Sequence, residues 1–324
     1  MRADYSMSKY LLISDIHLAD NPPSSRKDGY LDEILDLLRQ TVDIASEYNA
    51  VAVWAGDVFH IKTPGRNSFR MVGEVTDIAL SYPEGLYIVP GNHDLTNDRM
   101  DSIASQPLGQ LFKHTSVTML TGTEAMEDGY NIYGVPWLQR FTDEAVSSAL
   151  QRYRDEEWMP GENSLVVTHA PIYPPGRELK YEFYDTHKWA QYMGNKGNVF
   201  YGHVHDPHGI YTVDGVQFCN NGALSRGSLD ESNLKRDIVA TIWSDLNGEF
   251  YKIPLNSKSA EDIFKMEVKS AREAQVKLDD FLESIGQTSL AITTSSAVMQ
   301  YIKELNLGPE VETLIQELLD SCEV

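Results

Sequence analysis

The chain has 324 residues, 42% of them hydrophobic, and carries a formal net charge of −21 with an isoelectric point near 4.7. Its length suits one large α/β domain with a smaller appendage, and no apolar run reaches the roughly 18 residues that a membrane-spanning helix requires. The acidic balance excludes the basic surface by which an isolated nucleic-acid-binding domain is usually recognised, so contact with DNA would need positive charge from metal ions or from a partner.

Five short apolar runs in the first two-thirds of the chain predict β-strands. They cover Tyr10–Ile13, Val51–Ala55, Leu86–Val89, Leu165–Val167 and Val199–Tyr201. Short runs rich in β-branched and aromatic residues, bounded by polar motifs, are typical of strands. The run Val51–Ala55 is apolar throughout, which indicates a strand that is buried on both faces.

Two amphipathic helices are expected between the first three strands. Within Tyr30–Tyr48, apolar residues recur about every 3.6 positions, which indicates a helix with one face on the sheet. A second helix is expected from Ser68 to Leu80. This alternation of strands and helices predicts a sheet rich in parallel strands.

The pattern changes after Tyr201, where short strands are joined by tight turns. The strands expected there are Gly209–Thr212, Val216–Cys219, Ile238–Trp243 and Glu249–Ile253. The dipeptides Asp214-Gly215 and Asn247-Gly248 are strong signals for hairpin turns. The second half of the domain is therefore expected to be largely antiparallel.

The main domain is expected to cover residues 8–255, and a short α-rich tail at residues 259–324 to form a cap, a partner-docking element or both. A strand is predicted at Ile263–Val268, where apolar and charged residues alternate. Helices are predicted at 270–285, 295–305 and 309–319. The last of these carries an apolar stripe that would pack either on its own domain or on a partner.

A polar motif follows each of the first five strands, and these motifs contain six of the nine histidines. They are Asp15-Ile16-His17, Gly56-Asp57-Val58-Phe59-His60, Gly91-Asn92-His93-Asp94, His169 in Thr168-His169-Ala170, and Gly202-His203-Val204-His205. Side chains at the carboxyl ends of successive strands converge on one edge of a sheet. The sequence therefore predicts that these side chains form one site.

The donor types in the motifs suit a centre with two divalent metal ions. Two ions about 3.5–4 Å apart share one ligand, and the carboxylate of Asp57 suits this bridging position. Asp15 and His17, two positions apart in a loop, can hold the first ion. The remaining donors are Asn92, His169, His203 and His205. This mixture of nitrogen and oxygen ligands suits manganese, iron or zinc better than calcium.

A centre of this kind polarises phosphoryl oxygens and lowers the pKa of a bound water, so it predicts hydrolysis of phosphoesters by in-line attack. His93, which follows Asn92 but is not needed as a ligand, is the expected general acid for the leaving oxygen. Asp94 is expected to hydrogen-bond the His93 ring and fix its orientation. His60 either faces the substrate or begins a solvated loop.

Several other side chains leave two interpretations open. Arg226 could bind a substrate phosphate or pair with a structural carboxylate. Four aromatic residues could stack on a base or belong to the ordinary core, namely Tyr181, Phe183, Tyr184 and Trp189. The three histidines outside the motifs are expected to be surface or packing residues, namely His114, His187 and His208.

Only two cysteines are present, Cys219 and Cys322, which is too few for a disulfide framework. The segment that starts at Met1 also lacks the apolar core of a secretion signal. Both observations favour a reducing, cytoplasmic location.

Taken together, the five motifs resemble those of the calcineurin-like metallophosphoesterase superfamily over residues 10–254. The resemblance implies a two-sheet β-sandwich flanked by helices, with two metals at one end. Within the superfamily the chain is most similar to SbcD-type nucleases, the nuclease subunits of double-strand-break repair complexes. The stretches that carry this similarity are Gly56–His60 with Lys62-Thr63-Pro64, Val89–Asp94 and Asn221–Arg226.

The SbcD-type resemblance implies roles for particular residues. The first metal would be bound by Asp15, His17, Asp57 and His205. The second would be bound by Asp57, Asn92, His169 and His203, with His93 as the catalytic histidine. The resemblance also implies manganese-dependent exonuclease and endonuclease activity in DNA repair and recombination. The implied partners are DNA and an SbcC-type coiled-coil ATPase, with a homodimer as an open alternative.

Two other functional classes use the same observations differently. A phosphodiesterase or phosphatase for a small nucleotide or a cyclic nucleotide would need the same metals, and the acidic charge and the short tail favour it. A binding scaffold without activity is disfavoured, because none of the expected ligand positions has lost its donor.

Overall fold

A computed structural model describes residues 8–127, 130–155, 163–176 and 183–266, and eight isolated positions between 299 and 316. The chain divides into two compact units, Met1–Ile263 and Phe264–Val324. The predicted helices at 270–285, 295–305 and 309–319 lie outside the described residues except for those isolated positions. In the part of the chain that is described, no helix combines the length and the apolar character needed to cross a membrane.

The first of the two large sheets has six strands in the order β13-β12-β1-β2-β3-β4. Their bounds are Lys9–Ile13 for β1, Ala50–Ala55 for β2, Leu86–Val89 for β3, Val117–Met119 for β4, Val239–Ser244 for β12 and Glu249–Pro254 for β13. Strands β1 to β4 are parallel to one another. Strands β12 and β13 are added at one edge in antiparallel pairing.

The second large sheet has five strands in the order β10-β11-β9-β6-β5. Their bounds are Ile132–Val135 for β5, Leu165–His169 for β6, Asn198–Gly202 for β9, Gly209–Val213 for β10 and Val216–Asn220 for β11. Only β10 and β11 pair antiparallel, and the other neighbours are parallel. A separate two-stranded ladder joins β7 (Ile172–Tyr173) to β8 (Tyr184–Asp185).

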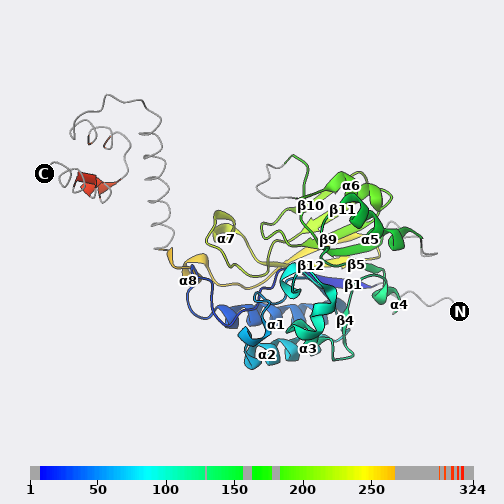
Figure 1. Cartoon of the computed structure of the whole chain (residues 1–324), viewed down its shortest axis with the longest axis horizontal. Coiled ribbons are helices and arrows are strands. Elements are labelled where there is room, and N and C mark those ends of the chain that lie inside the picture. Colours follow the sequence, from blue (N-terminus) through cyan, green and yellow to red (C-terminus); the bar gives the residue numbers. More distant parts are fainter. Residues whose placement is uncertain are drawn as a thin grey trace. The chain divides into compact units, whose positions relative to one another are not determined.

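Helices cover the outer face of each sheet, so the first unit has four layers (Figure 1). Helices α1 (Tyr30–Tyr48) and α2 (Phe69–Leu80) lie with the first sheet, and α5 (Asp143–Asp155) and α6 (Thr186–Tyr192) lie with the second. The shorter helices are α3 (Leu108–Leu111), α4 (Glu124–Glu127), α7 (Glu231–Lys235), α8 (Ala260–Ile263) and the 3-10 turns η1 (Pro64–Arg66), η2 (Asn92–Asp94) and η3 (Met100–Ser105).

The alternation of side chains along the central strands explains how both faces of each sheet are filled. In β1, Leu11 and Ile13 pack toward α1 and α2, whereas Tyr10 and Leu12 join a second cluster between the sheets. From the other sheet, Phe200 of β9 enters the same cluster. Because both faces are buried, the strands are nearly continuous apolar runs. Each large side chain buried in this way contributes about 1.5–3 kcal/mol.

The predicted mixed α/β fold, with two sheets flanked by helices, is the fold observed. The helices predicted at Tyr30–Tyr48 and Ser68–Leu80 are present, and Ser68 caps the second by accepting a hydrogen bond from the Met71 amide. The expected hairpins are also present. Asp214 and Gly215 both adopt positive φ, as the turn between β10 and β11 requires.

The strands after Tyr201 are largely antiparallel, as expected: β10 pairs antiparallel with β11, and β12 pairs antiparallel with both β1 and β13, whereas β11 pairs in parallel with β9. One expectation about the tail was wrong. The strand predicted at Ile263–Val268 is not formed in its described part, residues 263–266, where Ile263 ends helix α8 and the next three residues belong to no strand. Ser259 caps α8 by accepting a hydrogen bond from the Asp262 amide and donating to the Asp262 carboxylate, which explains why Ile263 is in a helix and not in a strand.

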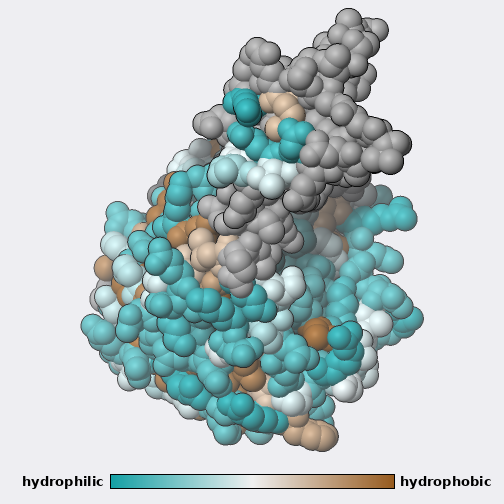
Figure 2. All heavy atoms as spheres, turned by 90° about the vertical axis from the view of Figure 1, so that its left-hand side faces the viewer, coloured by the Kyte–Doolittle hydropathy of each residue, from teal (hydrophilic) through white to brown (hydrophobic). Residues whose placement is uncertain are grey.

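The surface carries the polar residues that the composition predicts. Among the coloured residues of Figure 2, hydrophilic side chains cover most of the face drawn. Large apolar side chains that are strongly exposed are few in the described part of the chain, and Phe69, at 99% exposure, is the extreme case. The predicted boundary between the main domain (residues 8–255) and the tail (residues 259–324) stays a prediction.

Phe200→Ala is expected to lower the free energy of unfolding by about 3–5 kcal/mol, because the ring is fully buried between the two sheets. Phe69→Ala removes the same ring from an exposed position and should change stability by less than about 0.5 kcal/mol. Equilibrium urea unfolding of both variants measures the difference. Equal losses would contradict the assignment of Phe200 to the inter-sheet core.

Candidate metal centre

The seven predicted ligands lie together where five strands end. Loops after β1, β2 and β3 of the first sheet carry one part of the set, and the end of β6 and the loop after β9 of the second sheet carry the rest. The set consists of Asp15, His17, Asp57, Asn92, His169, His203 and His205. The site therefore joins the two sheets at one edge of the sandwich.

The backbone is unusual at four of these positions. Asp15, His17, Asp57 and His203 have φ values of 53°, 49°, 52° and 83°, in the left-handed region that residues other than glycine rarely adopt. Backbone hydrogen bonds between the first two loops maintain this conformation, including one of 2.9 Å from the His17 amide to the Asp57 carbonyl. Such strain concentrates at functional sites, where the surrounding structure holds it in place.

Four donors form the first half of the centre. Asp15, His17, Asp57 and His205 each offer one ligand atom, and these atoms all lie within 4.8 Å of one another. Nε2 of His17 is 3.6 Å from Oδ2 of Asp57, and Nε2 of His205 is 3.6 Å from Oδ1 of Asp15. Two carboxylates and two imidazoles at these distances are a suitable set for one divalent transition-metal ion.

The second half of the centre is built around the amide oxygen of Asn92. Oδ1 of Asn92 lies 3.2 Å from Nε2 of His169 and 3.1 Å from Nδ1 of His203. Nε2 of His169 is in turn 3.4 Å from Oδ2 of Asp57. Asp57 therefore contacts donors of both halves and occupies the position that a bridging ligand of two ions needs.

His169 is held in an orientation that suits metal binding. Its side chain is fully buried, and its Nδ1 lies 2.8 Å from the carbonyl oxygen of Ala55, to which it donates. In the neutral ring this hydrogen bond leaves the lone pair on Nε2, which faces Asn92 and Asp57. Donation from the second ring nitrogen to a carbonyl is the usual arrangement behind a metal-ligating histidine.

The two carboxylates are buried without a strong cationic partner. Asp15 and Asp57 are at most 2% exposed, and among the described residues only histidines pair with them. Burial raises the pKa of Asp15, and burial would also raise that of Asp57, but His169 and His17 outweigh it and hold the Asp57 pKa well below its usual range. Divalent cations would supply the missing positive charge, so these residues fit a metal centre.

The neighbouring histidines show the same competition between burial and charge. Burial, together with the nearby His169, lowers the pKa of His203 to about 3. For His169, burial is outweighed by the carboxylate of Asp57, which raises its pKa to about 9. The neutral form of His203 is the one that can donate a lone pair to a metal.

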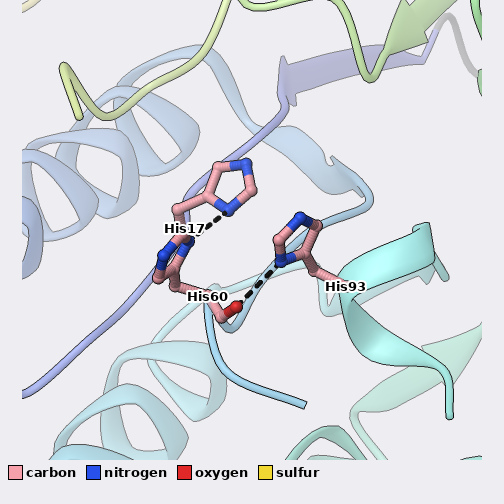
Figure 3. Close-up of side chains that lie close together, drawn as sticks. All are labelled: His17, His60 and His93. Carbon is pink, nitrogen blue, oxygen red and sulfur yellow. Dashed lines mark hydrogen bonds between the residues drawn. The ribbon is translucent and has the colours of Figure 1, made fainter. Parts of the chain in front are cut away.

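His93 and His60 lie beside the centre, together with His17 (Figure 3). The His93 amide donates to Oδ1 of Asp57 at 2.7 Å, and Nδ1 of His93 donates to the His60 carbonyl at 2.8 Å. The two rings are stacked, with centroids 5.4 Å apart and an interplanar angle of 17°. Nδ1 of His60 is 3.4 Å from Nδ1 of His17. Three imidazoles therefore line one side of the site.

Asp94 does not have the role predicted from the sequence. Its carboxylate is buried and accepts hydrogen bonds from the amides of Gly91, at 2.9 Å, and Val58, at 3.0 Å. Burial, together with the charge of Asp57, raises its pKa to about 7. The His60 carbonyl, which no sequence pattern could indicate, takes the predicted place of Asp94 beside the His93 ring. Asp94 instead ties the loops after β2 and β3 together.

Arg226 has the second of the two roles considered for it. Its side chain is 4% exposed and lies 3.4 Å from Glu33, which also pairs with the buried Arg26. This network supports the loop whose Ser225 donates to the Asp15 carbonyl at 3.3 Å. Arg226 is thus a structural cation behind the centre rather than a group facing a substrate.

The remaining candidates divide as their burial indicates. Tyr184 and Trp189 are core residues, Phe183 is 44% exposed, and Tyr181 lies outside the described residues. The three other histidines are placed away from the ligand set: His114 is exposed, His187 pairs with Asp214, and His208 contacts the Tyr201 hydroxyl.

One aromatic residue beside the centre was missed in the sequence. The ring of Trp137 lies 4.7 Å from that of His203 at an angle of 40°, and its amide donates to the Pro90 carbonyl at 2.9 Å. Its position directly after an apolar run that forms β5 (Ile132–Val135) was the available signal. The neighbouring strands β6 and β9 end in or are followed by histidines, whereas β5 is followed by this aromatic residue.

Comparison with protein families agrees with this geometry. The family model of the calcineurin-like phosphoesterases matches residues 8–207, which contain all five motifs. The chain belongs to this family. The protein is therefore a metal-dependent phosphoesterase, and its two-sheet fold and buried donor set are consistent with that membership.

The solved structures that match this phosphoesterase include a crystal structure of a dimetal phosphatase from Danio rerio. The two chains share 15% sequence identity with a TM-score of 0.46, over 77% of this chain and 99% of the other. No curated protein matches the chain.

Gly91→Ala is expected to weaken divalent-metal binding by about tenfold or more, because a Cβ at this position would overlap Oδ1 and the amide nitrogen of Asp57. Gly73→Ala is the matched control, since a Cβ there meets nothing within 4 Å in α2. The control should keep its metal affinity and gain up to about 1 kcal/mol of stability. Calorimetric titration with Mn²⁺ measures the affinities, and wild-type affinity in Gly91→Ala would refute the constraint on Asp57.

Proposed function

We propose that this phosphoesterase cleaves phosphodiester bonds in DNA, as an SbcD-like exonuclease and endonuclease that uses Mn²⁺. The observation that carries the proposal is the openness of the donor set. The His205 side chain is 49% exposed, and cavities of about 630 and 380 Å³ meet at His203. A scissile phosphate at the centre would thus have room for chain on both sides, which a phosphodiester in a polymer needs.

The residues supply most of what such a reaction requires. When bound, two divalent ions polarise the phosphoryl oxygens and lower the pKa of the attacking water. Asp57 lies between the two donor halves, and its negative charge would offset part of the positive charge of the two ions. His93 is fixed by its amide hydrogen bond to Asp57 and by donation from Nδ1 to the His60 carbonyl. Its Nε2 is then the ring nitrogen that delivers a proton to the leaving oxygen.

The preference for DNA rests on the sequence stretches that are similar to SbcD-type nucleases. The stretch Gly56–His60 lies beside the proposed acid, because the His60 carbonyl accepts a hydrogen bond from His93. The formal net charge of −21 argues that a partner provides basic surface for the DNA backbone. A coiled-coil ATPase of the SbcC type is the partner that we propose, with the tail at residues 259–324 as its docking element.

A small nucleotide or a cyclic nucleotide is the second candidate substrate. The acidic charge favours it, because a nucleotide needs only the cations at the centre, whereas a DNA duplex needs a long basic surface. The same residues would carry out the reaction. Rapid turnover of a cyclic nucleotide with no cleavage of DNA would decide for this candidate.

His93→Ala is expected to reduce cleavage of end-labelled DNA by about 10²- to 10⁴-fold, the usual contribution of a general acid. Its Mn²⁺ content, measured by mass spectrometry of the metal, should stay close to that of the wild type. His114→Ala, which changes an exposed histidine away from the centre, is the control and should cleave normally.

The assay uses single- and double-stranded substrates, with bis(p-nitrophenyl) phosphate in parallel, and a chelator should abolish every activity. Full activity in a clean His93→Ala preparation would remove His93 from the mechanism. Hydrolysis of the artificial ester alone, with DNA intact even when a coiled-coil ATPase is added, would refute the nuclease proposal.

A further inference from the structure

A cavity of about 630 Å³ adjoins the second half of the metal centre, and its walls are largely aromatic. The lining residues that matter here are Trp137, Arg140, Phe141, Thr142, Phe183 and His203. Its volume falls in the range of sites that hold small organic molecules. Because His203 belongs both to the cavity and to the metal donors, a ligand whose phosphate lies at the centre would extend directly into it.

Several aromatic rings line this cavity. Trp137 packs against His203 with ring centroids 4.7 Å apart, and Phe141 meets Trp137 in an edge-to-face contact at 4.9 Å and 65°. Phe183 contributes a ring that is 44% exposed to the same cavity. An exposed phenyl group beside a charged site is costly to hydrate and is common where a planar ligand binds.

Two polar groups belong to the residues that line this cavity. Arg140 is exposed and forms no ion pair with any described residue. The indole Nε1–H of Trp137 is buried and has no hydrogen-bond partner within the described ranges. The cavity thus offers flat apolar faces and one cation at its rim.

We propose that this cavity is a nucleobase subsite: it holds the base of the nucleotide whose phosphate lies at the metal centre, with Trp137 and Phe183 as stacking surfaces. The inference rests on the proposed function and specifies its substrate as a nucleotide unit. Stacking accepts every base because each has a π-face. Arg140 lies where it can contact a neighbouring phosphate of a longer chain.

Calorimetric binding to the Mn²⁺-loaded protein tests the subsite. The probes are thymidine 5′-phosphorothioate, chosen to slow hydrolysis, and deoxyribose 5-phosphorothioate, which has the same anionic group but no base. We expect the thymidine compound to bind about tenfold more tightly, which is the contribution of one stacked base. Trp137→Leu should bring this ratio close to one, with unchanged affinity for the baseless probe and unchanged Mn²⁺ content.

Two further variants make the result decisive. Phe183→Ala, at a half-exposed position, should also reduce the ratio and serves if Trp137→Leu fails to fold. Phe69→Ala removes an exposed ring from outside this cavity and should leave the ratio at its wild-type value. A wild-type ratio of one, no measurable binding of either probe, or a ratio that survives in both cavity variants would overturn the proposal.

The outcomes also separate this proposal from the nuclease proposal. A tenfold ratio without any cleavage of DNA would keep the base subsite and favour a small nucleotide as substrate. Cleavage of DNA with a ratio of one would keep the nuclease and remove the subsite. Cleavage rates of a DNA strand with a single abasic residue at the scissile position provide an independent check.

Discussion

The burial of two carboxylates is the constraint on which the rest of this structure depends. Asp15 and Asp57 are removed from water at the edge of the sandwich, and transferring such ions into a protein interior costs several kcal/mol each. Within the described part of the chain their partners are imidazoles and the backbone amides of His203 and His93, and neither lysine nor arginine pairs with them. The loops of the centre bring these partners close to the two carboxylates, and divalent cations would supply further positive charge at the site.

This requirement explains the strained backbone around the centre. A carboxylate that must turn back toward the loop of a neighbouring strand cannot continue the extended conformation of its own strand. The left-handed φ of Asp15 and Asp57 makes the turn in a single residue, and hydrogen bonds between the two loops stabilise it. The buried Arg226–Glu33 pair lies next to the Asp15 loop, because the neighbouring Ser225 donates a hydrogen bond to the Asp15 carbonyl.

Much of the fold could be predicted from the sequence because each ligand motif directly follows an apolar run. The strand positions and the convergence of the motifs followed from that local pattern alone. The roles that could not be predicted depend on contacts with residues far away in the sequence. Asp94 bonds to the Val58 loop instead of His93, and Trp137 gains its importance only from the nearby His203. Helix α8 (Ala260–Ile263) includes the first residue of the strand expected at Ile263–Val268, because Ser259 caps this helix.

The donors of the centre come from two different sheets, and this has a mechanical consequence. The loops with Asp57 and Asn92 follow strands of one sheet, while His169 and His203 belong to the other. The layer of side chains between the sheets, which includes Val53 and Phe200, therefore sets how far apart the two groups of donors stand. Protein interiors compress very little, so this layer acts as a spacer of fixed thickness. A substitution that widens this layer, even far from the metals, would change the distance between the two groups of donors. It would therefore alter the metal preference before it unfolds the protein.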